Sequence, residues 1–232
     1  MLTADEWGIV WLSLQVSLVA IAGALPVAFG LAYLLARGRF PGKVVIDALV
    51  HLPLVLPPVV VGWMLLIAFA PNGLLGAPLQ RWLGVSLMFR WTGAALAAAV
   101  MALPLMVRSI RLSIEAVDPR LEAAARTLGA GRIDAFVTIL LPLARPGVLA
   151  ALVLGFARSL GEFGATITFV SNVPGQTATL PLAIYSALQA PGQEVTVWRL
   201  ALISVALSLG ALIASEMLVR QGPVRDRDAH VL

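Results

Sequence analysis

The chain has 232 residues, of which 60% are hydrophobic and only 12% charged, whereas a soluble domain carries about 25% charged residues. This composition excludes an ordinary soluble domain, and the length allows one integral membrane domain over residues 1–232. No cysteine is present, so disulfides and thiolate metal sites are excluded. The formal net charge of +4 raises the question of whether the basic residues serve nucleic-acid binding or membrane topology.

Apolar runs predict about five transmembrane helices in an all-α, polytopic membrane protein, since one span needs about 20 residues. The runs cover residues 12–36, 48–70, 91–107, 146–170 and 198–219. The third run is shorter, but Arg90 and Arg108 flank it and can snorkel to the interfaces. In the second run, Pro53, Pro57 and Pro58 break regular helix near the cytoplasmic end. Such a break is tolerated only against protein or a water-filled cavity.

The segment between the fourth and fifth runs is mostly uncharged and rich in Pro, Gly and Gln. Within it, residues 180–189 are expected to form a short helix. The pattern fits an interfacial helix and a re-entrant helix equally well.

The positions of the 16 Lys and Arg residues orient these helices, because cytoplasmic loops carry the basic excess. Arg158 lies inside the fourth run, and Arg81, Arg90 and Arg199 lie on one side. The other twelve lie after the first and third runs and in the C-terminal tail: Arg37, Arg39, Lys43, Arg108, Arg111, Arg120, Arg126, Arg132, Arg145, Arg220, Arg225 and Arg227. The N-terminus is therefore expected outside and the C-terminus inside. Topology explains the basic excess, so no nucleic-acid partner is expected.

Within the cytoplasmic loop 108–145, residues 118–129 predict a short helix. Asp118 suits the N-cap and Pro119 the first helical position, while Gly129 suits the position just past the end. One face is apolar and is made by Leu121, Ala124, Ala125 and Leu128. Periodicity by itself fits a solvated loop as well as a docking helix. A second short helix is expected over residues 133–141, stopping at Pro142.

Arg158 and Glu162 are charged residues inside the fourth run. Counted from Pro146, Arg158 lies about 18 Å deep, near the bilayer midplane, where a charge is a functional hypothesis. Arg158 could attract an oxyanion along a pore. Alternatively, Arg158 and Glu162, at i and i+4, neutralise each other. Ser159 and Thr166 add hydroxyl groups nearby and complete the set of pore or gate candidates.

The sequence has no set of residues typical of an enzyme. No nucleotide-binding motif, Ser/His/Asp set or pair of catalytic carboxylates is found, so ATP-driven work requires a separate ATPase subunit that binds ATP and Mg²⁺. The two histidines are His51 and His230, and no cluster around them suggests a metal site. We therefore expect no catalytic residue, no metal and no cofactor on this chain.

Three strings resemble a known family. RLEAAARTLG at 120–129 resembles the EAA loop of ABC importer permeases, which forms coupling helices that dock into a groove on the cytoplasmic ATPase. HLPLVLPPVVVG at 51–62 and RSLGEFGA at 158–165 resemble the molybdate ABC transporter permease subunit more than its sulfate or phosphate relatives. The resemblance covers residues 11–219.

This resemblance implies a type I importer permease fold and a multi-pass location in the bacterial cytoplasmic membrane. It implies a homodimer of permeases, two cytoplasmic ABC ATPase subunits and a periplasmic or extracytoplasmic molybdate-binding protein. Molybdate, and tungstate as its near-twin, would cross by alternating access. The residues expected to couple to the ATPase are Glu122, Ala123, Ala124, Leu128 and Gly129. A permease for another oxyanion such as sulfate or phosphate, or an ATP-independent secondary transporter, remains the alternative.

Overall fold

A computed structural model describes residues 2–220, and within this range every regular element is a helix. The elements in chain order are α1 (Ala4–Arg37), α2 (Lys43–Val55), α3 (Pro58–Phe69), α4 (Gly76–Leu83), α5 (Trp91–Glu115), α6 (Pro119–Thr127), α7 (Arg132–Ala135), the π-helical turn η1 (Phe136–Leu140), α8 (Leu141–Leu160), α9 (Gly164–Val170), α10 (Leu180–Gln189) and α11 (Glu194–Arg220). Four helices are long and apolar enough to cross a membrane, or five if the bent pair α2 and α3 counts as one span. The all-α, polytopic expectation is thereby confirmed.

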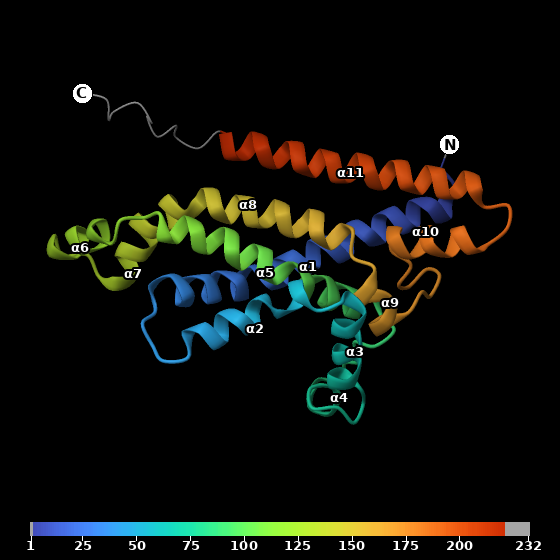
Figure 1. The fold of residues 1–232 in the computed structure, drawn as a ribbon, viewed down its shortest axis with the longest axis horizontal. Coiled ribbons are helices and arrows are strands. Elements are labelled where there is room, and N and C mark those ends of the chain that lie inside the picture. The colour runs from blue at the N-terminus through green and yellow to red at the C-terminus, as the bar shows by residue number, and fades with distance from the viewer. Residues whose placement is uncertain (1, 221–232) are drawn as a thin grey trace.

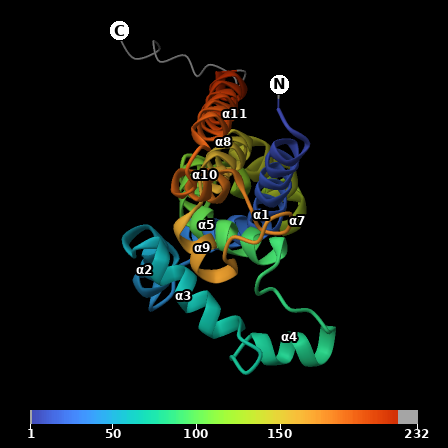
Figure 2. The same ribbon diagram turned by 90° about the vertical axis from the view of Figure 1, so that its right-hand side faces the viewer.

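The long helices α1, α5, α8 and α11 run along the long axis of the molecule (Figure 1; Figure 2). Small residues let them approach closely, as is common in membrane bundles. A Cβ added to Gly147 of α8 would lie 2.2 Å from Ser113 Cβ of α5. Serine hydroxyls reinforce this contact, because Ser109 Oγ donates to the Gly147 carbonyl at 3.1 Å and Ser113 Oγ to the Ala144 carbonyl at 3.2 Å.

The second apolar run is a bent pair, in which α2 and α3 meet at 114°. The break falls between Val55 and Pro58, as Pro57 and Pro58 predict. The prediction was wrong for Pro53, which lies inside the regular helix α2. Beyond it, α3 leaves the long axis of the bundle and leads to α4 (Figure 1; Figure 2). Gly62 of α3 packs on α9, since an added Cβ would lie 2.5 Å from the Ala165 carbonyl oxygen. The broken backbone therefore lies against protein, as its depth requires.

Helix boundaries around the cytoplasmic loop differ from the expectation. The third run continues as helix to Glu115, so Arg108 and Arg111 lie on α5 rather than in a loop. The second short helix does not stop at Pro142, because α7, η1 and α8 form one continuous helix over Arg132–Leu160. Pro142 directly follows the π-helical turn η1 inside this continuous helix, and the local departure from α-helical hydrogen bonding accommodates its missing N–H. The π turn before it shifts the hydrogen bonds, and the Leu141 N–H donates to the Phe136 carbonyl.

The fourth run is also broken, because α8 ends at Leu160 and the seven-residue α9 begins at Gly164. The short helix expected over residues 180–189 is present as α10. Its first residue, Leu180, donates its N–H to Ser13 Oγ of α1 at 2.7 Å. This buried bond fixes the start of α10 against the outer part of α1.

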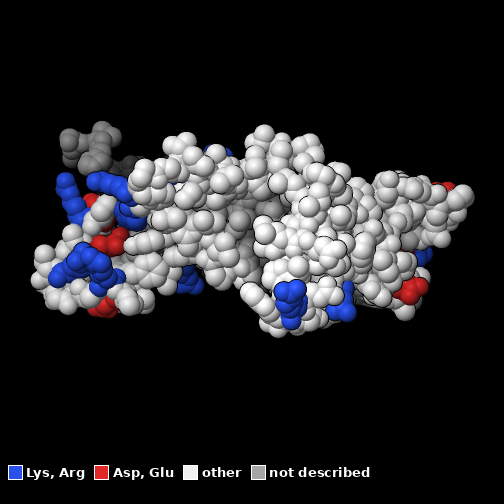
Figure 3. All heavy atoms as spheres, turned by 90° about the horizontal axis from the view of Figure 1, so that it is seen from below, with Lys and Arg blue, Asp and Glu red and all other residues white. Residues whose placement is uncertain are grey.

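Charged side chains gather at the end of the molecule formed by α6 and α7, whereas the long middle of the surface is mostly uncharged (Figure 3). The N-terminus and α10 lie at the opposite end (Figure 1). The charged end with α6 and α7 is therefore the end that the basic residues predict to be cytoplasmic. The side chain of Arg220 and the tail residues Arg225 and Arg227, which also entered the topology argument, lie outside the part that the structure describes.

Candidate functional site

The helix α6 forms where its capping residues predict it. Asp118 is the N-cap, and its carboxylate accepts the Arg120 N–H at 2.9 Å. Pro119 occupies the first turn, and Gly129 adopts a φ of +98° just past the helix, a conformation that favours glycine. None of the residues of α6 is buried. The helix therefore projects from the bundle and presents most of its surface to a partner or to solvent.

An apolar surface covers α6 and the following turns. Leu121 is 48% exposed, Leu128 89% and Ile133 80%, and Ala123 and Ala124 beside them are exposed as well. Exposed apolar side chains grouped in this way are typical of a protein interaction site. Of the five residues expected to couple to an ATPase, only Glu122 is half-buried.

Glu122 makes a contact that sequence spacing did not predict. Its Oε1 lies 3.1 Å from Nη2 of Arg37 on α1, whereas Arg126, the i+4 residue, is not its ion-pair partner in the described part of the chain. Nη2 of Arg37 also donates to the Val117 carbonyl at 2.9 Å. From the sequence, Arg37 was expected to act only as one of the charges that set the topology. The partner is 85 residues away, and no local pattern signals such a pair.

A second contact joins α1 to the same segment. The ring of Phe136 on η1 packs edge-on against Phe29 and Tyr33, with centroid distances of 5.8 Å and 5.6 Å. Such edge-to-face pairs contribute beyond their buried area. The inner half of α1 therefore contacts the chain at both ends of α6. Arg37 contacts Val117 and Glu122 at the start of α6, and the rings of Phe29 and Tyr33 contact Phe136 after it.

The four pore or gate candidates lie together at the break between α8 and α9. Arg158 Nη1 lies 2.6 Å from Glu162 Oε2, so the mutual neutralisation considered for this pair is realised. Glu162 Oε1 also accepts the Ala165 N–H at 2.8 Å, in the first turn of α9. The Glu162 side chain is only 2% exposed and that of Arg158 is 27% exposed. Part of the arginine side chain is therefore accessible from outside the protein, whereas the carboxylate is not.

Ser159 and Thr166, in the same segment of the chain, are both buried. Ser159 Oγ has no hydrogen-bond partner among the described residues. Residues 158–166 therefore combine a buried carboxylate, a partly accessible guanidinium and buried hydroxyls at one backbone break. Their role toward an anion stays a prediction.

A polar cluster that sequence analysis did not assemble ties α2 to α5. Arg111 Nη1 lies 3.0 Å from Asp47 Oδ1, and its Nε lies 2.8 Å from Glu115 Oε1. His51 Nδ1 lies 2.8 Å from the Asp47 carbonyl oxygen, so this histidine has a hydrogen-bond partner on its own helix. These residues and Arg108 line a cavity of about 310 Å³. The i, i+4 spacings of Asp47 with His51 and of Arg111 with Glu115 were the available signals.

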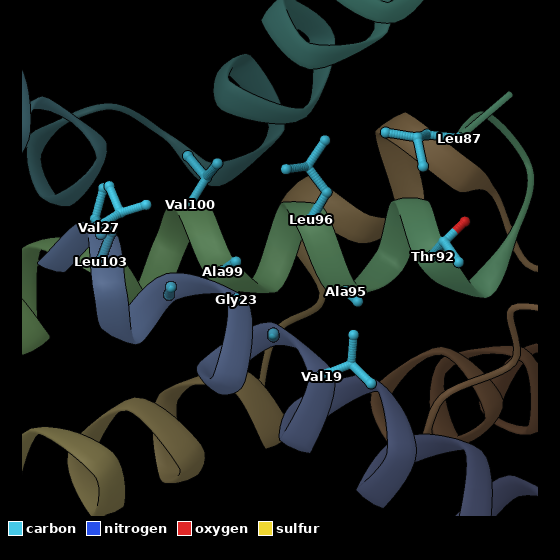
Figure 4. Close-up of a pocket in the computed structure, with 12 residues that line it drawn as sticks. Val19, Gly23, Val27, Leu87, Thr92, Ala95, Leu96, Ala99, Val100 and Leu103 are labelled. Carbon is cyan, nitrogen blue, oxygen red and sulfur yellow. The ribbon is translucent and has the colours of Figure 1, made fainter. Parts of the chain in front are cut away.

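A larger cavity of about 460 Å³ lies between α1 and α5 and is lined almost entirely by apolar side chains (Figure 4). Val19, Leu96 and Leu103 are among them, and the Thr92 hydroxyl is the polar group that Figure 4 labels. An apolar lining does not compensate a charged ligand for lost hydration. This cavity therefore does not suit an oxyanion.

Comparison with known proteins gives relatives over nearly the whole chain. A family model described as "Binding-protein-dependent transport system inner membrane component" matches residues 24–221. The "Molybdenum transport system permease protein ModB" of Escherichia coli (strain K12) is 56% identical, over 94% of this chain and 96% of that protein. The "Sulfate transport system permease protein CysT" of Salmonella typhimurium is 38% identical, over 75% of this chain and 64% of that protein.

The fold is also found in solved structures. The crystal structure of a bacterial ABC transporter involved in the import of the acidic polysaccharide alginate matches with a TM-score of 0.75 at 18% identity, over 96% of this chain and 81% of that chain. At this identity the match speaks for the fold alone, which is that of a type I ABC importer permease. The described helices, the projecting α6 and the match over residues 24–221 lead to one assignment: the chain belongs to the family of inner membrane components of binding-protein-dependent transport systems.

Proposed function

We propose that this chain is the pore-forming permease subunit of an ATP-driven importer that carries molybdate, and tungstate as its near-twin, across the cytoplasmic membrane. The observation that carries this proposal is the 56% identity to a molybdenum transport permease over 94% of the chain. The sulfate permease is less similar, at 38% identity over 75% of the chain. A sulfate or phosphate cargo is therefore the weaker alternative.

The proposed complex contains two copies of this chain and two ABC ATPase subunits, and a periplasmic or extracytoplasmic binding protein delivers the anion. The exposed side chains of Leu121, Leu128 and Ile133 on the cytoplasmic end supply an apolar surface for the ATPase. On the bent arm, Val59 is 54% and Trp63 55% exposed, which supports a second copy covering α3. ATP and Mg²⁺ would bind the ATPase, with no cofactor on this chain.

Roles within the chain follow from position. Glu122, Ala123, Ala124, Leu128 and Gly129 would pass the movement of the ATPase to the bundle, because they form the exposed helix α6 and its end. Arg158, Ser159, Glu162 and Thr166 would line or gate the pore at the α8–α9 break. A gate at a helix break is reasonable, because such a break has fewer backbone hydrogen bonds to hold it rigid than a continuous helix.

Uptake of radiolabelled molybdate at nanomolar concentration tests the cargo. The gene is deleted and then restored, and tungstate or sulfate is added in excess as a competitor. We expect uptake to be lost on deletion, restored by the gene, blocked by tungstate and unaffected by sulfate. Strong competition by sulfate would move the cargo to another oxyanion. Uptake by the purified chain in vesicles without ATPase or ATP would instead indicate a secondary transporter.

A further inference from the structure

Arg37, the last residue of α1, joins the transmembrane bundle to the projecting helix α6. Its Nη2 donates to the Glu122 carboxylate at 3.1 Å and to the Val117 carbonyl at 2.9 Å. The side chains of Arg37 and Glu122 are 20% and 23% exposed, so both lie largely out of water. A charge-assisted hydrogen bond in such a place is stronger than an exposed surface ion pair.

Apart from this contact with α1, α6 packs mainly against the turns that follow it, α7 and η1. No residue of Pro119–Thr127 is buried, and the Asp118 cap acts only within the helix itself. Outside α6, Val117 is buried, with 6% exposure, and its carbonyl is the second acceptor of Arg37. One guanidinium nitrogen therefore fixes both the residue that leads into α6 and the first turn of the helix.

We infer that Arg37 is a positioning residue for transport: by holding Glu122, it sets the orientation in which α6 meets the ATPase and passes a displacement of α6 to α1. This inference rests on the coupling role proposed for α6. It gives Arg37 a role that Arg39, two residues further on, does not share. Arg39 is exposed and makes no ion pair with any side chain that the structure describes, although it carries the same topological charge.

A double-mutant cycle in the complete complex, reconstituted in vesicles, tests this inference. The variants are Arg37→Ala, Glu122→Ala and the pair together, and the readout is molybdate accumulated per ATP hydrolysed. We expect each single variant to lower this ratio about tenfold, the factor that corresponds to one charge-assisted hydrogen bond. The double variant should lose no more than either single variant, and Arg39→Ala should keep the wild-type ratio. A wild-type ratio in Arg37→Ala, or losses that multiply in the double variant, overturns the inference.

A second readout does not depend on transport. Because the chain has no cysteine, a nitroxide on Arg126→Cys reports the mobility of α6 by electron paramagnetic resonance in the assembled complex. We expect Arg37→Ala to mobilise the label, Arg37→Lys to restore order and Arg39→Ala to change nothing. If Arg37→Ala does not assemble, Glu122→Ala must mobilise the label in its place. An immobile label in Arg37→Ala or, where that variant does not assemble, in Glu122→Ala contradicts the inference. Failure of the wild-type complex to accumulate molybdate would instead overturn the proposed function and leave the label result valid.

Discussion

Glu162 satisfies two donors at the α8–α9 break, the guanidinium of Arg158 at 2.6 Å and the Ala165 N–H at 2.8 Å. A buried carboxylate with these two partners stabilises the helix break, whether or not an anion passes it. Arg158 is different, because 27% of its side chain remains exposed. The same ion pair can therefore hold the break together and still present a positive charge to an anion.

Glu162→Gln separates these two roles. It leaves an acceptor for the Ala165 N–H but removes the counter-charge of Arg158. We expect the free energy of unfolding to fall by about 2 kcal/mol. This is less than for a fully buried ion pair, because Arg158 keeps part of its hydration. The thermal midpoint of the purified complex should fall by about 5 °C.

The double variant Arg158→Met with Glu162→Gln supplies the control. It contains no unpaired charge, so the thermal midpoint should return toward the wild-type value. If Arg158 attracts the anion, molybdate uptake should stay low in spite of this recovery. Recovery of uptake together with stability would show that Arg158 only neutralises Glu162.

At the scale of elements, glycine contacts decide how α3 and α9 pack. A Cβ on Gly62 would lie 2.5 Å from the Ala165 carbonyl oxygen and 2.9 Å from Thr168 Cβ. A Cβ on Gly164 would lie 2.7 Å from Pro58 Cβ. Two glycines, one on each helix, therefore set the distance at which the bent arm meets the break that carries Glu162.

Gly62→Ala should push α3 away from α9 and destabilise the protein by about 1–3 kcal/mol, as overpacking does. Gly30→Ala on α1 is the matched control, because nothing lies within 4 Å of an added Cβ there. That change should be neutral or stabilising by up to about 1 kcal/mol, since alanine favours helix over glycine. The thermal midpoints of the two purified variants test whether the midpoint falls in Gly62→Ala but not in Gly30→Ala. A drop of equal size in both would contradict the packing argument.

Local signals explain which elements were predictable from sequence. The bounds of α6 followed from Asp118, Pro119 and Gly129, because caps act on neighbouring residues. The break at Pro57 and Pro58 followed from missing N–H donors. The continuous helix through Pro142 was missed because the π turn η1 rearranges the hydrogen bonds before it, and neither residue type nor period indicates such a turn.

Long-range pairing explains what the sequence left out of the candidate site. Arg158 and Glu162 are four residues apart, so their ion pair could be considered beforehand. Arg37 and Glu122 are 85 residues apart, and only the folded bundle brings them together. The same holds for Asp47 and Arg111, which are 64 residues apart. Arg37 and Arg111, which the sequence explains only as charges that set the topology, therefore have specific ion-pair partners in the structure.

At the scale of the whole molecule, the absence of cysteine makes the topology directly testable. Asp5 lies at one end and Arg126 at the other, and both are exposed. In intact cells, an impermeant maleimide should label Asp5→Cys, once the outer membrane, where present, is made permeable. It should label Arg126→Cys only after the cytoplasmic membrane is opened. The reverse order of labelling would invert the topology and remove α6 from the side of the ATPase.

Ser13, whose Oγ accepts the Leu180 N–H, lies on the same helix as Arg37. α1 has 34 residues, so it is about 50 Å long and reaches from α10 at the outer face to α6 at the inner face. A tilt of about 5° around the inner end of such a rod moves its outer end by about 4 Å. The first helix thus links the two sides of the membrane domain, through Ser13 in its outer part and Arg37 at its inner end. Pro26 lies between these two contacts, at a position where a helix can bend.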